Sequence, residues 1–244
     1  MKVFGLTHCG AVRPENQDSF RISQSEDGEL LTVVLCDGMG GEQAGSVASR
    51  IAADTFMSHA ANSLDASSTA ADLHMILKDA VSYANIKVYD RSFADFSCMG
   101  MGSTLVGLLA NGKRICVANV GDSRAYLISS RRAEQITRDH SLVEEMVSRG
   151  KISRAEAMNH PQKNIITRAV GVEASVTADL YDVKLSADSR ILLCSDGLSN
   201  LITGEEMRLV CSNNDDAERI CTALLDLALK RGAPDNVTVI LIER

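Results

Sequence analysis

The sequence has little that would divide the chain or place it in a membrane. It contains three prolines, no tryptophan and 4% aromatic residues among 244, and no stretch approaches about 18 uninterrupted apolar residues. We therefore expect neither a membrane span nor a signal peptide, and the predicted location is the cytoplasm. No Pro-rich linker, repeat or low-complexity tract interrupts the chain, so residues 1–244 are predicted to form a single domain.

Paired cysteines and excess positive charge are also missing. The seven cysteines are scattered, odd in number and without a C-x-x-C spacing, which fits neither a zinc knuckle nor a disulfide framework. Most should be small buried hydrophobes. The net charge of −7 argues against nucleic acid or an anionic membrane as the main partner. With 45% hydrophobic residues, the core should consist of Val, Leu, Ile, Ala and Met.

One stretch, LTVVLCDGMGG at 31–41, is the most informative. Its short, β-branched start predicts a buried strand that delivers Asp37 to its end. A carboxylate there needs a partner, because burying an isolated charge costs several kcal/mol or more. The following glycines let the backbone come close to a metal ion or a phosphate. A tight turn with a capping aspartate explains this stretch alone equally well.

The remaining pattern predicts layered helices and antiparallel strands, an α+β chain. Apolar residues recur at three- and four-residue steps over 44–61 and 72–88, which predicts two core-facing helices. Gly5 to Asp18 is interpreted as a polar approach, and Asp27-Gly28 and Asn111-Gly112 as hairpin turns, the latter of type I′. Further strands are predicted over 19–22, 103–110, 114–120, 124–129, 190–194 and 236–242, and further helices over 205–211 and 215–231.

Four aspartates share one context: each lies at a predicted strand end beside a glycine or a turn residue. They are Asp37, Asp122, Asp196 and Asp235. Taken singly, each is more often a turn or strand-start residue, but four together favour a site. If these ends converge, the like charges must be neutralised by cations, and oxygen ligands without His or Cys select Mg²⁺ or Mn²⁺. Two bridged ions about 3.5–4 Å apart would activate water for in-line attack on phosphorus.

Arg13 is the complementary element of such a site. A guanidinium can hold two phosphate oxygens at once while a metal cluster holds the others. Without the aspartates, Arg13 would be interpreted as an ordinary surface arginine.

Seven motifs in order resemble the metal-dependent protein phosphatases, the type 2C serine/threonine class in its compact bacterial form. They are RPENQD (13–18), VVLCDGMGG (33–41), GSTLVGLL (102–109), ANVGDSRAYL (118–127), TRDHS (137–141), ILLCSDGL (191–198) and PDNVTVILI (234–242). Each motif is weak, but the ordered set is specific and runs through nearly the whole chain. The resemblance implies a four-layer α-β-β-α sandwich with two central antiparallel sheets and metals in a cleft at one end.

The resemblance also implies Mn²⁺ or Mg²⁺ as cofactor and names the residues that would bind it. Asp37 would bridge two ions, the Gly38 carbonyl would bind one of them, and Asp196 and Asp235 would bind the other. Asp122 would hold a third, weaker ion.

Two catalytic roles and one variable segment follow from the same resemblance. Asp18 would orient a metal-bound water, and Arg13 would clamp the phosphate. Residues 141–165, polar and helical in pattern, would correspond to the family's variable flap, where substrate selection is expected.

Two positions depart from commoner versions of the family pattern. Gln17 stands where many members have glutamate, and Met39 stands where eukaryotic members have a histidine proposed to protonate the leaving group. Methionine cannot do so, and the proton must come from water or another residue. His140 is a candidate, although a helix-start or packing role fits it better.

The resulting hypothesis is an Mn²⁺/Mg²⁺-dependent serine/threonine protein phosphatase that opposes a cytosolic kinase. We expect phosphorylated proteins and a cognate Ser/Thr kinase as partners, no nucleic acid or membrane, and a monomer. Met39 and Gln17 leave open a non-catalytic, metal-binding pseudophosphatase or regulatory module. A third possibility is a phosphatase dedicated to an anti-anti-sigma-type regulator.

Overall fold

Two antiparallel sheets form the centre of the computed structural model, which describes residues 1–41, 44–112, 114–214 and 216–244. The five-stranded sheet has the order β1-β11-β10-β7-β8. Its strands are Lys2–His8 (β1), Val237–Glu243 (β11), Ser189–Cys194 (β10), Arg124–Ser129 (β7) and Ala133–Gln135 (β8). The second sheet has the order β2-β3-β5-β6-β9, with β4 beside β3. Its strands are Asp18–Gln24 (β2), Leu30–Met39 (β3), Gly102–Ser103 (β4), Leu105–Asn111 (β5), Ile115–Val120 (β6) and Asp179–Val183 (β9).

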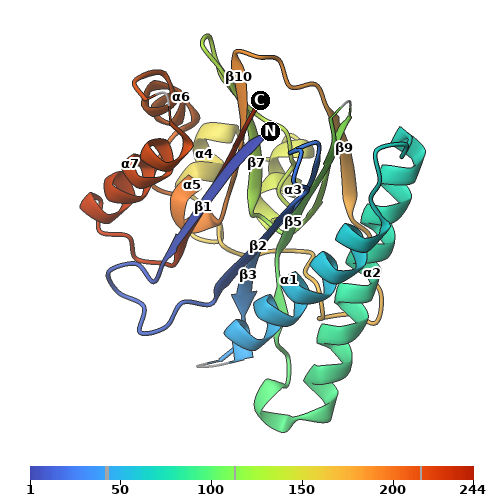
Figure 1. The fold of residues 1–244 in the computed structure, drawn as a ribbon. Helices are drawn as coiled ribbons and strands as arrows, with labels where there is room; N and C mark the ends of the chain where they lie inside the picture. Colours follow the sequence, from blue (N-terminus) through green and yellow to red (C-terminus); the bar gives the residue numbers. More distant parts are fainter. Residues whose placement is uncertain (42–43, 113, 215) are drawn as a thin grey trace.

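Helices cover the outer face of each sheet. The long helices α1 (Ala44–Ser63) and α2 (Ala70–Ala94) pack on the second sheet, and α6 (Gly204–Ser212) and α7 (Ala217–Lys230) pack on the first. Figure 1 shows the two helical layers on opposite sides of the sheets. The expected four-layer α-β-β-α sandwich is therefore confirmed.

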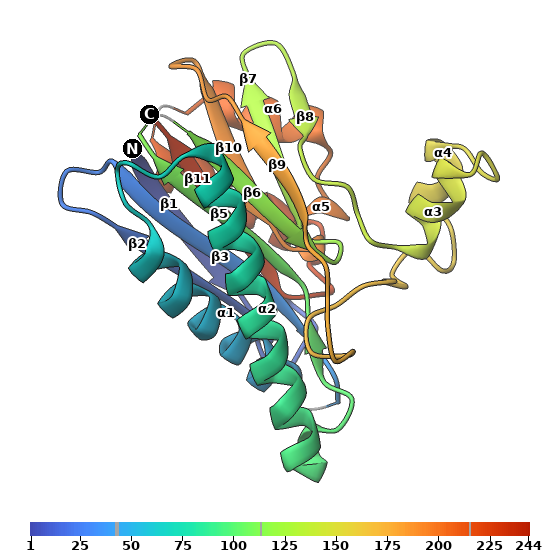
Figure 2. The ribbon, with the colours of Figure 1, turned by 90° about the vertical axis from the view of Figure 1, so that its right-hand side faces the viewer.

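The remaining helices of the described chain are short. The 3₁₀ turn η1 spans Phe96–Cys98, and α5 spans Asp196–Ser199. The pair α3 (Leu142–Ser148) and α4 (Arg154–Met158) lies within the predicted flap and stands away from the sheets in Figure 2. Among the described residues, none of the helices has the length and apolar character needed to cross a membrane.

Strand β3 shows why its sequence is apolar without interruption. Val34 and Cys36 belong to the apolar layer beneath α1 and α2. Leu31, Val33 and Leu35 point the other way, into the layer between the two sheets. Because successive side chains of a strand point to opposite faces, a strand covered on both sides needs apolar residues at every position. A third apolar layer lies between the first sheet and α6 and α7.

Two sequence-based assignments were wrong, and strand β9 was missed. Gly5 to Asp18 is not wholly a polar approach, because Lys2–His8 forms β1 and pairs with β11 along its whole length. Asn111 ends β5 instead of occupying the centre of a type I′ turn. Its φ is not positive, and its side chain accepts a hydrogen bond from the Arg114 amide at 3.1 Å. Strand β9 was not predicted, because its sequence, DLYDV, is too polar to give a clear strand pattern. The strand lies at the edge of the second sheet.

Other boundaries agree or lie outside the described residues. The Asp27-Gly28 turn joins β2 to β3, and Gly28 has a φ of 71°. The strand predicted over 103–110 is present as β4 and β5, which keep one register against β3. The predicted start of the last helix at Asp215 lies outside the described residues, and α7 is described from Ala217.

The contact between β5 and α1 gives a test of this packing. A Cβ at Gly107 would overlap the ring of Phe56, which is fully buried on α1. We expect Gly107→Ala to lower the free energy of unfolding by about 1–3 kcal/mol, because overfilling a packed core forces side chains off their rotamers. Urea unfolding measures the change. Gly204→Ala is the control, since its Cβ would meet only ordinary contacts at the start of α6. Equal midpoints for Gly107→Ala and the wild type would contradict this packing.

Candidate active site

One end of the layer between the sheets is polar, and strand alternation explains which side chains gather there. Leu193 of β10 and Ile240 of β11 point into this layer, so Ser195 and Thr238, two residues away along each chain, point the same way. On β3, Asp37 likewise follows Leu35. The apolar layer therefore ends in a set of polar side chains supplied by both sheets.

Asp18 connects the two sheets at this end. It lies directly opposite Asp37 in the β2–β3 register and is 6% exposed. Its Oδ2 accepts hydrogen bonds from Ser195 Oγ at 2.8 Å and from Thr238 Oγ1 at 2.6 Å. Its Oδ1 is buried and has no hydrogen-bond partner within the described part of the chain. That oxygen is therefore a free hydrogen-bond acceptor on the strand next to Asp37.

A cleft of about 660 Å³ lies at this end of the sheets, and all four predicted aspartates line it. Asp37 comes from the end of β3, Asp122 from the β6–β7 loop, Asp196 from the start of α5 and Asp235 from the residues before β11. The strand ends therefore converge as expected from the sequence. Gly38 and Arg13 line the same cleft.

Two glycines allow the backbone segments around the cleft to lie close together. A Cβ at Gly38 would overlap the Gly45 carbonyl at the start of α1, and a Cβ at Gly197 would overlap the Asn236 carbonyl. Any larger residue would therefore push α1 away from β3, or α5 away from β11. The D-G pairs at 37–38 and 196–197 thus combine a carboxylate with a position that has no room for a Cβ.

Hydrogen bonds from neighbouring strands fix the backbone of Asp37. Its amide donates to Thr104 Oγ1 at 2.9 Å, and its carbonyl accepts from the Thr104 amide at 2.8 Å. Thr104 Oγ1 also lies 2.7 Å from Ser123 Oγ, next to Asp122. Asp37 and the Asp122 loop are therefore held by one threonine.

Asn236 organises the opposite wall of the cleft. Its Oδ1 accepts from the Gln17 amide at 2.8 Å, and its Nδ2 donates to the carbonyls of Cys9 and Glu15 at 2.8 and 2.9 Å. One side chain thus ties the segment between β1 and β2 to the start of β11.

The carboxylates oppose one another's ionisation. Burial, followed by the nearby Asp18 and Asp196 charges, raises the pKa of Asp37 well above its usual range. The same two causes, burial and neighbouring aspartates, raise the pKa of Asp18 and of Asp122 to about 7. The pKa of Asp196 is also raised, and its carboxyl is close enough to Asp37 to share a hydrogen bond. Without a cation, the cluster favours retained protons.

Arg13 is bound within the cleft by one of the aspartates. Its Nη2 donates to Asp235 Oδ2 at 2.8 Å, and this bond raises the pKa of the guanidinium. The side chain remains 54% exposed, so its other N–H groups face solvent and are accessible to a ligand.

Three residues bear on the departures noted in the sequence. Met39 lines the cleft and has no proton to donate. Gln17 also lines it, and its Nε2 donates to the Gly41 carbonyl at 3.3 Å. His140 is not among the described residues that line the cleft. Its Nδ1 accepts from the Gly121 amide at 3.0 Å, and its Nε2 lies 3.2 Å from Asp179, which fits a packing role behind the Asp122 loop.

Known proteins resemble this chain over nearly its whole length. A sequence model of the family described as protein phosphatase 2C matches residues 7–238. The chain belongs to the protein phosphatase 2C family. It is 37% identical over 238 residues to the serine/threonine phosphatase stp of Listeria monocytogenes, covering 98% of this chain and 94% of that protein. It is 33% identical over 243 residues to protein phosphatase PhpP of Streptococcus pneumoniae, covering 99% and 97%.

A solved structure agrees with the family assignment. The serine/threonine phosphatase Stp1 from Staphylococcus aureus superposes with a TM-score of 0.92 at 36% identity, covering all of this chain and 95% of that one. The similarity therefore extends over the sheets, the helices and the cleft-forming loops of this phosphatase 2C chain.

Phosphatases of the 2C family are metal-dependent, and the cleft fits a hard divalent cation. Among its described lining residues there is no histidine or cysteine, so the donors are carboxylate and carbonyl oxygens. Burial, followed by neighbouring carboxylates, raises the pKa of Asp37 and of Asp196, so a cation there would relieve unfavourable negative charge. Asp18 also keeps a buried oxygen without a partner in the described part of the chain.

Sequence reasoning missed four residues that build the phosphatase 2C cleft: Thr104, Ser195, Asn236 and Thr238. All four lie inside the recognised motifs, but none carries an obvious charge. A signal existed for Thr238, because it interrupts the apolar face that Ile240 and Ile242 continue. A polar residue on such a face requires a polar partner.

The carboxyl cluster predicts an unusual pH dependence for the metal-free protein. The Asp18 carboxyl has a usual pKa of 3.8 and a folded pKa of about 7. Its protonated form therefore contributes its full stabilisation below pH 3.8, and this stabilisation is lost as the pH rises from there through about 7. In EDTA, we expect the melting temperature to fall between pH 5 and 7.5, by about 3–6 °C per unit for one such carboxyl. Differential scanning calorimetry measures this trend.

The control for this effect is Asp18→Asn, which removes one titrating group and keeps the side-chain shape. We expect a flatter pH dependence in EDTA for this variant than for the wild type. A melting temperature that rises over the same range in both proteins would show that the cluster is not protonated in the folded state.

Proposed function

We propose that this chain hydrolyses phosphoserine and phosphothreonine in proteins, with Mn²⁺ or Mg²⁺ as cofactor. The convergence of four aspartates and Arg13 on one cleft, in a protein phosphatase 2C chain, carries the proposal. The names of the relatives, serine/threonine phosphatases, support the same substrate class. We further propose that residues 1–244 act as one domain.

The metal ligands are proposed residue by residue. Asp37 would bridge two ions, the Gly38 carbonyl would bind one, and Asp196 and Asp235 would bind the other. Asp122, on the loop near the flap, would bind a third and weaker ion. When bound, these ions supply the Lewis acidity that activates water for attack on phosphorus.

The protein's own side chains supply binding and orientation. Arg13 keeps one bond to Asp235 and offers its remaining N–H groups to phosphate oxygens. Asp18, held through Oδ2 by Ser195 and Thr238, has Oδ1 available to accept a hydrogen bond from water. Because Met39 has no proton to give, we propose that the leaving-group proton comes from solvent.

The flap over residues 141–165 is proposed to select the substrate. Its last turn reaches the cleft, since Asn164 and the following Ile166 line it. Ion pairs hold the flap together: Glu144 of α3 contacts Arg138 and Arg154. We also propose that the protein is a cytoplasmic monomer. Its partner would be a cognate cytosolic kinase.

The decisive test is metal-dependent turnover in Asp196→Ala. We expect Mn²⁺-dependent hydrolysis of p-nitrophenyl phosphate and of a phosphothreonine peptide by the wild type, and a loss of at least about 100-fold in kcat/KM for the variant. Asp79→Ala, on the exposed face of α2, is the matched control and should keep full activity. Unchanged turnover in Asp196→Ala, or none in the wild type, would contradict the proposal.

Arg13→Lys tests the phosphate clamp. Lysine keeps the charge but cannot bind two oxygens in a fixed geometry, so inhibition by inorganic phosphate should weaken about 10-fold or more, as expected for lost hydrogen bonds to a charged group. Product-inhibition kinetics give the inhibition constant. A constant equal to that of the wild type would mean that Arg13 does not bind phosphate.

A further inference from the structure

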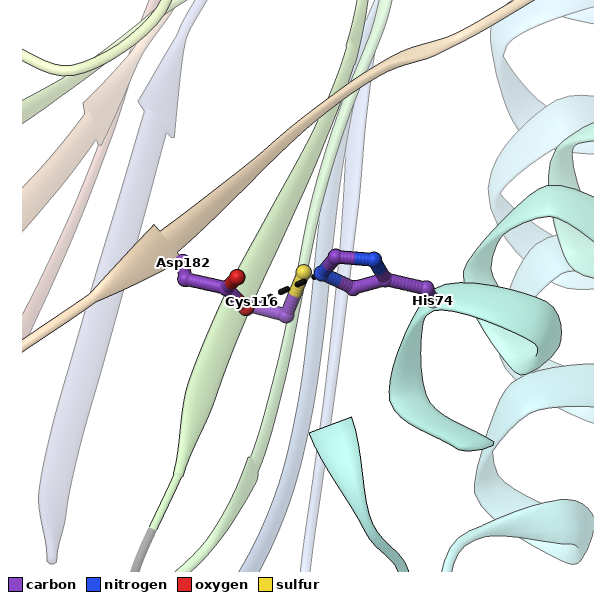
Figure 3. Close-up of side chains that lie close together, drawn as sticks. All are labelled: His74, Cys116 and Asp182. Atoms are coloured by element: carbon purple, nitrogen blue, oxygen red, sulfur yellow. Dashed lines mark hydrogen bonds and ion pairs between the residues drawn. The ribbon is translucent and has the colours of Figure 1, made fainter. Parts of the chain in front are cut away.

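A second group of potential metal ligands lies away from the cleft, between α2 and the edge of the second sheet. It consists of His74 on α2, Cys116 on β6 and Asp182 on β9. One nitrogen, one sulfur and one carboxylate oxygen from these residues lie within 4.8 Å of one another. Figure 3 shows the three side chains pointing toward a common centre.

The fold places these side chains together for identifiable reasons. Cys116 and Asp182 are directly opposite each other in the β6–β9 register, so their side chains lie on the same face of the sheet. That face is covered by α2, because Cys116 packs in the same apolar layer as Leu73 and Leu77. His74, next to Leu73 on the helix, reaches Asp182, with Nε2 2.9 Å from Oδ1.

We propose that His74, Cys116 and Asp182 bind one zinc ion. A thiolate, an imidazole and a carboxylate are the ligand types that zinc takes in four-coordinate sites, and three protein ligands leave the fourth position to water. The proposal specifies zinc over Mg²⁺ or Mn²⁺, because a sulfur ligand is soft and those ions prefer oxygen.

Burial gives the site both an inner ligand and an entry path. Cys116 is fully buried, whereas the side chains of His74 and Asp182 are 35% and 66% exposed. Zinc can therefore approach from solvent through the two exposed ligands and reach the sulfur behind them. This arrangement explains why an exposed carboxylate lies directly over a buried thiol.

The charge balance also fits. Burial, followed by the neighbouring Asp182 charge, raises the pKa of the Cys116 thiol to about 12, so the thiol is neutral without metal. Zinc binding would release that proton to solvent and form a Zn–S bond. The resulting thiolate and the Asp182 carboxylate together carry two negative charges, which the dication neutralises. The present His74–Asp182 hydrogen bond would be replaced by a bond from each residue to zinc.

The proposed site is separate from the catalytic cleft. Through the strand registers, Cys116 is aligned with Leu109 and then with Thr32. Thr32 precedes Asp37 by five residues on β3, which corresponds to about 17 Å along a strand. The ion would join α2 to the edge strand β9 and would not contact the reacting phosphate.

Cobalt(II) spectroscopy of the full-length protein tests the assignment, because Co²⁺ reports its ligands. A thiolate ligand produces an intense ligand-to-metal charge-transfer band in the near ultraviolet, which the oxygen ligands of the catalytic cleft cannot produce. We expect this band to saturate with one bound Co²⁺ per chain and to disappear when one equivalent of Zn²⁺ is added after saturation.

The variants separate this site from every other cysteine. Cys116→Ser should abolish the band, and His74→Asn, a change at a partly exposed position, should weaken Co²⁺ affinity at this site at least 10-fold while keeping the fold. Cys9→Ser is the matched control, because Cys9 is the cysteine most exposed to solvent, and it should keep the band. Absence of the band in the wild type, its survival in Cys116→Ser, or its loss in Cys9→Ser would overturn the proposal.

Discussion

Excess negative charge at the end of the inter-sheet layer is the constraint on which the active end of this molecule depends. Asp18 and Asp37 face each other across two paired strands, and burial, followed by neighbouring carboxylates that include Asp196 and Asp235, raises the pKa of both. Such a cluster is unfavourable unless protons or cations neutralise it. The surrounding apolar layers hold the strands in register, and the register holds the carboxylates together. The stability of the apolar core therefore keeps these carboxylates close together despite their mutual repulsion.

The hydrogen bonds around Asp18 show how both sheets share this task. Asp18 belongs to the second sheet, while its partners Ser195 and Thr238 follow or belong to strands of the first. Removing the Asp18 carboxyl would take away the acceptor that both buried hydroxyls share, and the loss of such a partner costs about 1–3 kcal/mol. The connection between the sheets at this end is therefore polar, in contrast to the apolar layer farther along, to which Leu35 and Ile240 belong.

Much of the fold was predictable because its signals are local. The alternating and continuous apolar runs identified most strands, and the D-G pairs identified Asp37 and Asp196. Strand β1 was missed because its sequence mixes apolar and polar residues, and its burial comes from pairing with β11, more than 200 residues away. The roles of Thr104 and Asn236 have the same origin, since each bonds to segments distant in sequence. Local patterns identify ligands and strands, but not the partners that orient them.

The two groups of potential metal ligands differ in a way that follows from their positions on the sheet. The cleft lies at strand ends, where glycine lets backbones approach and where carboxylates and carbonyl oxygens can face one ion. The His74, Cys116 and Asp182 cluster lies between α2 and the edge of the second sheet, at mid-strand positions of β6 and β9 where side chains supply the donors. A mid-strand site must therefore rely on side-chain donors, and a buried one favours a small apolar donor such as cysteine. The strand ends thus supply oxygen ligands for hard ions, whereas the mid-strand cluster adds a sulfur and a nitrogen donor to one carboxylate, as zinc prefers.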